Sequence, residues 1–108
     1  MKHYVEDKVV VITGGSSGFG LEAARILLEM GARIVITGRS QDKLDNAVAE
    51  LDSDNLLAVQ ADANSTKDWK DLIEKVIERF NRIDVLVNNH GAGIKISNVD
   101  EMSDDELQ

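Results

Sequence analysis

Short apolar runs alternate along this chain with longer segments in which apolar positions recur every three to four residues. The runs lie at 8–13, 33–37, 56–61 and 83–88, and valine, isoleucine and leucine dominate them. Runs of this length and composition are typical of parallel strands, which are buried on both faces because helices cover both sides of such a sheet. The pattern therefore predicts four buried strands.

Three segments between these runs have the period of amphipathic helices. The first spans 19–30 and is expected to end at Gly31. Ser40 is the predicted N-cap of the second helix, and Ser65, with Asp68 three residues later, is that of the third. The apolar stripes behind these two caps are Leu44, Ala47, Val48 and Leu51, and Trp69, Leu72, Ile73, Val76, Ile77 and Phe80. We expect the two aromatic rings in the core, because a stacking surface for bases would need them exposed.

Strands that alternate with helices predict an α/β fold, a Rossmann-like doubly wound parallel sheet with right-handed crossovers. The expected strand order is 3-2-1-4, with a ligand crevice between strands 1 and 4, where the order reverses. Residues 89–102 are predicted to form a loop. Ser103 and Glu106 then have the spacing of a capping box, so 103–108 is expected to begin another helix. The fold is expected to be partial, with about four strands, and truncated after the fourth.

Composition and charge narrow the class of protein. Acidic residues outnumber basic ones by 20 to 12 and the net charge is −8, which disfavours nucleic-acid binding. The chain has no cysteine, and His3 and His90 are far apart in the sequence, so neither a disulfide nor a metal site is expected. We find no apolar run long enough to cross a membrane and no signal peptide. These features predict one domain over 1–108 in a cytoplasmic protein.

A glycine-rich turn, TGGSSGFG, connects the first predicted strand to the first helix. Gly14, Gly18 and Gly20 would let the backbone turn tightly and approach a diphosphate closely. The helix that follows points free N–H groups at the same place, which favours an anion. The turn is not a Walker loop, since no Gly-Lys-Ser/Thr follows it. The alternative is a purely structural turn between strand and helix.

The end of the second strand bears on the choice of dinucleotide. An acidic residue there would accept a hydrogen bond from the 2′-hydroxyl of NAD(H). The chain instead has Gly38 and then Arg39, which removes a negative charge and offers a planar set of donors to a 2′-phosphate. We therefore predict NADP(H) over NAD(H). The alternative is that Arg39 is a solvated surface residue.

Four motifs resemble the N-terminal half of a short-chain dehydrogenase/reductase. They are TGGSSGFG at 13–20, TGR at 37–39, ADA at 61–63 and LVNNHG at 86–91, in the order and spacing of that family. The resemblance implies a set of cofactor-binding residues: Gly14, Ser16, Ser17, Gly18, Phe19, Gly20, Arg39, Ser40, Asp62, Ala63, Asn89, His90 and Gly91.

The resemblance also implies a role for each of these positions. Residues 14–20 would line the phosphates and adenosine, Arg39 and Ser40 would hold the 2′-phosphate, and Asp62 and Ala63 would meet the adenine. Asn88 would brace the sheet, and 89–91 would pass the cofactor ribose. Asp62 has the alternative role of a turn residue. His90 stands where the family usually has alanine, and it could crowd the ribose, bond to it or be a neutral replacement.

No residue of this chain is expected to be catalytic. In the family, a tyrosine and a lysine four residues later carry the chemistry, and the resemblance places both beyond residue 108. Tyr4 and Lys8 have that spacing but lead into the first strand, at the end of the sheet opposite the ligand crevice. We therefore weigh two functions, the NADP(H)-binding portion of an oxidoreductase and a stand-alone, non-catalytic binding or interaction module. A homo-oligomer formed through the exposed edge of the fourth strand is also expected.

Overall fold

The computed structural model describes residues 4–90 and 93–99 of the chain. Four strands of the described part, β1 (Val9–Thr13), β2 (Arg33–Gly38), β3 (Leu56–Gln60) and β4 (Val85–His90), confirm the four runs expected from the sequence. A fifth strand, β5 (Gly93–Asn98), follows them. The helices are α1 (Gly18–Glu29), α2 (Gln41–Leu51) and α3 (Thr66–Phe80).

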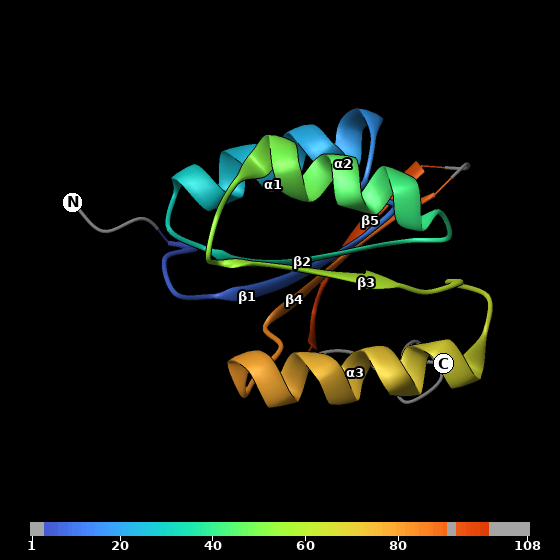
Figure 1. Ribbon diagram of the computed structural model, residues 1–108. Coiled ribbons are helices and arrows are strands. Elements are labelled where there is room, and N and C mark those ends of the chain that lie inside the picture. The colour runs from blue at the N-terminus through green and yellow to red at the C-terminus, as the bar shows by residue number, and fades with distance from the viewer. Residues whose placement is uncertain (1–3, 91–92, 100–108) are drawn as a thin grey trace.

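The strands form one sheet in the order β3-β2-β1-β4-β5. The first four are parallel, so the expected order 3-2-1-4 and the partial Rossmann fold are confirmed. The helices α1 and α2 cover one face of the sheet and α3 covers the other (Figure 1). The carboxyl ends of β1, β2, β3 and β4 therefore meet along one edge.

Side chains of the central strands alternate between two cores, as the two-residue period of a strand requires. On β1, Val9 and Val11 belong to the core under α3, whereas Val10 and Ile12 belong to the core under α1 and α2. Trp69 and Phe80, the aromatic residues of the α3 stripe, are buried as expected.

Local hydrogen bonds explain where two of the helices begin and end. Ser40 Oγ accepts from the backbone N–H of Lys43 at 3.3 Å, and Ser65 Oγ accepts from that of Asp68 at 3.2 Å, which confirms both predicted caps. Asp52 and Asn81 end α2 and α3 in the left-handed conformation, a common way of closing a helix.

The loop predicted over 89–102 is wrong over most of its length. Residues 89–90 continue β4, and β5 pairs with β4 antiparallel in a register that places Val87 opposite Ile96. The fourth strand is therefore not the edge of the sheet, so the exposed edge on which the expected oligomer contact depends is wrong. The helix expected over 103–108 lies outside the described residues. Val48 and Ile77, expected on buried stripes, are exposed, because they lie at the margins of their helical faces.

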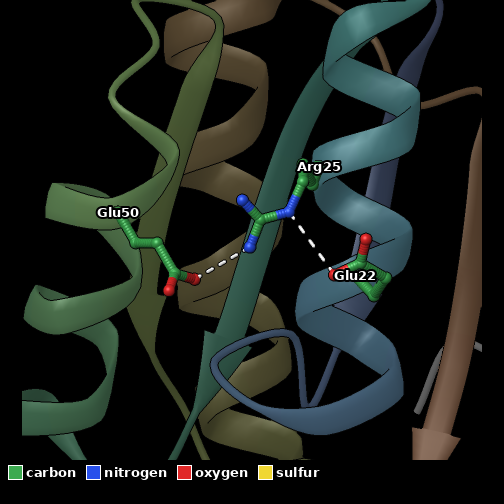
Figure 2. Close-up of polar contacts among 3 residues, drawn as sticks. All are labelled: Glu22, Arg25 and Glu50. Atoms are coloured by element: carbon green, nitrogen blue, oxygen red, sulfur yellow. Dashed lines mark hydrogen bonds and ion pairs between the residues drawn. The ribbon is translucent and has the colours of Figure 1, made fainter.

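A surface ion-pair network joins the two helices on the first face of the sheet. Arg25 of α1 contacts Glu22 of the same helix at 3.4 Å and Glu50 of α2 at 3.0 Å (Figure 2). The attraction of Glu22, followed by that of Glu50, outweighs the effect of burial and raises the pKa of Arg25. Because the three side chains are exposed to solvent, this network orients α1 and α2 more than it stabilises them.

Candidate functional site

A cavity of about 420 Å³ opens at the carboxyl ends of the parallel strands. Its wall comes from the segments that follow β1, β2, β3 and β4, which are distant in sequence. The lining residues are Thr13, Gly14, Ser16, Ser17, Thr37, Gly38, Arg39, Ser40, Lys43, Ala61, Asp62, Ala63, Asn64 and Asn89. This is the crevice expected where the strand order reverses.

Two glycines of the β1–α1 turn are required by close contacts of the backbone. Gly14 has φ +67°, and a Cβ there would lie 2.6 Å from the carbonyl oxygen of Asn89. A Cβ at Gly20 would lie 2.4 Å from the carbonyl oxygen of Gly14. Any side chain at either position would push α1 away from the ends of β1 and β4. The glycines thus hold the first turn of α1 against the cavity.

The N-terminus of α1 differs from those of α2 and α3. Its N-cap, Ser17, makes no side-chain cap hydrogen bond, and the first turn contains no acidic residue. The other two helices have both features. The first N–H groups of α1 therefore have no side-chain cap, Ser17 borders the cavity, and the helix dipole favours an anion at this end of the helix.

The end of β2 supplies the positive charge of the cavity wall. Arg39 and Ser40 follow Gly38 directly, and Lys43 lies in the first turn of α2. A Cβ at Gly38 would lie 3.1 Å from Ser16 Oγ, so the hydroxyl of Ser16 fills the place beside the end of β2. The chain therefore presents cations and hydroxyls at the position where an acidic side chain could have stood.

The segment between β3 and α3 forms the opposite part of the wall. Asp62 Oδ1 accepts from the N–H of Asn64 at 2.9 Å, the turn role that was its alternative, while the residue also lines the cavity. Asp68 of α3 accepts from the N–H of Asp62 at 2.8 Å. The indole N–H of Trp69 donates to the carbonyl of Ala63 at 2.6 Å. The first turn of α3 thus fixes this part of the wall.

Thr13 joins the ends of β1 and β4 at the floor of the cavity. Its hydroxyl donates to Asn88 Oδ1 at 3.0 Å and accepts from the N–H of Asn89 at 2.9 Å. The amide of Asn89 reaches the carbonyl of Gly14 at 3.4 Å. Asn88 therefore braces the sheet, as the family resemblance implied, and it does so through Thr13.

The structure brings together most of the residues that the sequence singled out. Gly14, Ser16, Ser17, Arg39, Ser40, Asp62, Ala63 and Asn89 all line the cavity. The three residues at 18–20 do not line it and instead form the first turn of α1, where Phe19 is 68% exposed. His90 is the last residue of β4, but its side chain and all of Gly91 lie outside what the structure describes.

Five further residues line the cavity although the sequence did not indicate them as wall residues: Thr13, Thr37, Lys43, Ala61 and Asn64. For Lys43 a signal was present, since it is the residue whose N–H the predicted cap Ser40 should bind, which places it in the first turn of α2. Tyr4 is 84% exposed and precedes β1, at the end of the sheet away from the cavity, as expected. Across residues 4–90 and 93–99, no three His, Asp or Glu side chains cluster as metal ligands would. None of the described helices combines the length and apolar character needed to span a bilayer.

The sheet order, the uncapped helix and the cavity define a nucleotide-binding α/β module of the Rossmann type. The family model described as short chain dehydrogenase matches residues 8–108, and the chain belongs to that family.

Relatives and solved structures agree with this assignment. The chain is 37% identical, over 92% of its length, to dehydrogenase/reductase SDR family member 4 of Caenorhabditis elegans, of which it covers 39%. A crystal structure of a short chain dehydrogenase from Bacillus anthracis is 45% identical with a TM-score of 0.77, and the match covers 81% of this chain and 36% of that one. The 3-ketoacyl-(acyl-carrier-protein) reductase of Brucella melitensis, complexed with NADH, is 35% identical with a TM-score of 0.76, covering 94% and 42%. The chain thus spans about two-fifths of the length of these proteins.

Proposed function

We propose that this chain is the NADP(H)-binding portion of a short-chain dehydrogenase/reductase and that residues 1–108 form the N-terminal part of its nucleotide-binding domain. The observation that carries the proposal is the first turn of α1, which has neither a side-chain cap nor an acidic residue and borders a cavity lined by Arg39 and Lys43. Such a cavity is suited to an anionic, elongated ligand.

The residues of the wall fit the parts of a dinucleotide. The α1 turn with Ser16 and Ser17 would bind the phosphates, Asp62 and Ala63 would meet the adenine, and Asn89 would pass the cofactor ribose. Gly14 and Gly20, at which a side chain would collide with backbone, let α1 come close enough for its N–H groups to reach a phosphate. The bound nicotinamide would supply hydride transfer to or from a carbonyl/alcohol pair.

The preference for NADP(H) rests on the end of β2. Gly38 brings no negative charge to the wall, and Arg39 provides donors for a 2′-phosphate. A charge-assisted contact of this kind contributes about 1.5–3 kcal/mol, which is about a ten- to hundredfold change in affinity. That the Brucella reductase was complexed with NADH is a property of that protein.

Calorimetric titration of the purified chain with NADP(H) and NAD(H) tests this preference. We expect tighter binding of NADP(H), and we expect Arg39→Ala to weaken NADP(H) by about ten- to a hundredfold while NAD(H) changes little. Arg33→Ala is the matched control, because Arg33 lies on the same strand at the end away from the cavity. Equal affinity of the unmodified chain for the two cofactors would contradict the proposal.

The second candidate function is a non-catalytic binding module. It is favoured by the position of Tyr4, the one tyrosine of the sequence, far from the cavity. The two functions are distinguished by extending the reading of the encoding DNA past codon 108 and looking for a tyrosine followed four residues later by a lysine. A cytoplasmic location and a homo-oligomeric state stay predictions, and the edge of β4 through which the oligomer was expected to form is paired with β5.

A further inference from the structure

Lys43 is a cation of the cavity wall to which neither the sequence motifs nor the family resemblance gives a role. It is the third residue of α2, and its backbone N–H is bound by the hydroxyl of Ser40 at 3.3 Å. This cap fixes the first turn of α2, so that Lys43 lines the same cavity as Arg39 and Ser40, which connect β2 to that turn.

The charge of Lys43 is uncompensated within the described residues. Three other cations, Arg25, Lys67 and Arg82, each contact a carboxylate within 3.4 Å. In the part of the chain that the structure describes, the side chains of Arg39 and Lys43 have no such partner, although the chain carries 20 acidic residues. Two unpaired cations on one wall favour a ligand that brings its own negative charge.

The hydroxyl groups of the same wall are able to donate to an anion. Ser40 Oγ accepts from the Lys43 N–H, which leaves its own O–H free to donate. Ser16 Oγ lies beside Gly38, 3.1 Å from where a Cβ of that residue would be. The carboxylate on the cavity wall, that of Asp62, follows β3 and accepts from the N–H of Asn64. Asp62 is therefore the main competitor for Lys43.

We propose that Lys43 is a specificity-determining residue that binds the 2′-phosphate of the adenosine ribose together with Arg39. The inference rests on the proposed function, since it assigns a second cation to the phosphate that distinguishes NADP(H) from NAD(H). A flexible ammonium group complements the planar guanidinium, because it approaches a phosphate oxygen as a point charge from another direction.

The probes are adenosine 2′,5′-bisphosphate and adenosine 5′-monophosphate, which differ only in the 2′-phosphate and need no contact at the nicotinamide end. Both are titrated calorimetrically into the chain at low and at physiological ionic strength. Lys43→Met should lower the affinity for the bisphosphate by about three- to tenfold and leave the affinity for the monophosphate unchanged. The expected effect is modest because Lys43 is exposed and solvent partly screens its attraction to a phosphate. Lys70→Met, a change of an exposed lysine of α3 that does not line the cavity, is the control and should alter neither.

Two further variants sharpen the outcome. Lys43→Arg should restore the bisphosphate affinity, and Arg39→Met/Lys43→Met should bind the two probes equally within about twofold, since no cation is left for the 2′-phosphate. Equal weakening of both probes by Lys43→Met would indicate a partner such as Asp62 and would overturn the inference, as would no weakening at all. If the unmodified chain does not prefer the bisphosphate, the proposed cofactor preference itself fails. If it does prefer it and Lys43→Met is silent, only the role of Lys43 fails.

Discussion

Trp69 belongs to the hydrophobic core and also supports the wall of the cavity from behind, through Ala63. Its ring is 8% exposed and packs among the valines and leucines under α3. Its indole N–H donates to the carbonyl of Ala63, in the segment expected to meet the adenine. A core residue thus holds a functional loop in place, because a buried indole N–H needs a partner and the loop provides it.

Replacing Trp69 with phenylalanine removes the hydrogen bond and keeps most of the apolar contact. We expect Trp69→Phe to lower the free energy of unfolding by about 1–3 kcal/mol, since a hydrogen bond and some packing are lost together. It should also lower the affinity for adenosine 5′-monophosphate, because the carbonyl of Ala63 is no longer held by the indole N–H. Urea unfolding and calorimetry measure the two effects. Val76→Ala is the contrast, since it should destabilise the core without altering the affinity of the folded chain.

Gly38 and Ser16 are so close that the size of one side chain limits the size of the other. A Cβ at Gly38 would lie 3.1 Å from Ser16 Oγ and 3.9 Å from a methyl carbon of Leu44. The first distance is too short for an unperturbed contact, so a larger residue at the end of β2 requires Ser16 to move. A larger residue introduced at position 38 to change the proposed cofactor preference would therefore also have to be accommodated by Ser16.

A carboxylate introduced at position 38 tests this coupling. We expect Gly38→Asp alone to destabilise the chain by about 1 kcal/mol, as mild overpacking does, and to weaken NADP(H). Ser16→Gly/Gly38→Asp should recover the stability and bind NAD(H) more tightly than Gly38→Asp does. Thermal unfolding and calorimetry are the measurements. The effect of Ser16→Gly on stability is compared in the unmodified chain and in the Gly38→Asp variant. Equal effects in the two backgrounds would show that the two positions are independent.

At the scale of elements, Asp84 connects the beginnings of β1 and β4. Its Oδ2 accepts from the N–H of Val9 at 2.9 Å, and Oδ1 accepts from Arg82 at 2.6 Å. Burial by itself raises the pKa of Asp84, but the hydrogen bonds from Arg82 and Val9 and the charges of Arg82 and Lys8 together lower it below 3.8. The ionised carboxylate is thus the form that holds the two strands.

This lowered pKa predicts a loss of stability in acid. Because the folded state binds the proton less readily than the unfolded chain, the contribution of Asp84 is complete well above pH 3.8 and disappears as the pH falls through the folded pKa. Asp84→Asn should cost about 1–2 kcal/mol at pH 7 and should flatten the dependence of stability on pH below 4. Urea unfolding between pH 2.5 and 7 measures both (about 0.5 pH unit per step suffices). Asp71→Asn, on the surface of α3, should change little.

The strand β5 converts β4 from an edge strand into an internal strand of the sheet. It lies antiparallel beside β4 and pairs with it from Val85 to His90. In a purely parallel arrangement β4 would expose its free backbone groups at an edge, which invites association. With β5 in place that edge is paired, and oligomerisation through β4 would require the two strands to separate.

At the scale of the whole molecule, the cavity gathers the groups to which the proposed function assigns the adenosine side of a dinucleotide. Hydride transfer also needs a group that protonates or stabilises the carbonyl oxygen. Tyr4 lies at the opposite end of the sheet, so it cannot reach a substrate at the cavity. The described part of the chain therefore supports binding and offers no tyrosine for catalysis.

We accordingly expect the purified 108-residue chain to bind NADP(H) and to show no measurable turnover. The absence of a positioned acid costs about 10²–10⁴-fold in rate. The assay follows NADPH oxidation with a panel of ketones and aldehydes, using protein free of host reductases. Turnover that persists in Tyr4→Phe and disappears in His90→Ala would contradict the prediction and identify His90 as the acid.

Much of the fold and part of the site were predictable from local pattern. The valines and isoleucines of 9–13 predict a strand buried on both faces, and Ser40 and Ser65 predict helix starts, because these features depend on a few adjacent residues. The glycine turn was readable for the same reason. The strand at 93–98 was missed although Ile94 and Ile96 alternate with polar residues, since so short an alternation predicts a strand only when a free partner edge is known.

What the sequence by itself determined is the order of strands and helices and the polar residues that follow each strand. Both are local consequences of hydrophobic period, capping and turn chemistry. The tertiary structure alone decided that Lys43 shares a wall with Ser16, that Trp69 anchors Ala63 and that β5 pairs with β4. Each of these arrangements depends on how separate elements meet in space, that is, on how the helices pack across the sheet and on which strand edge is free.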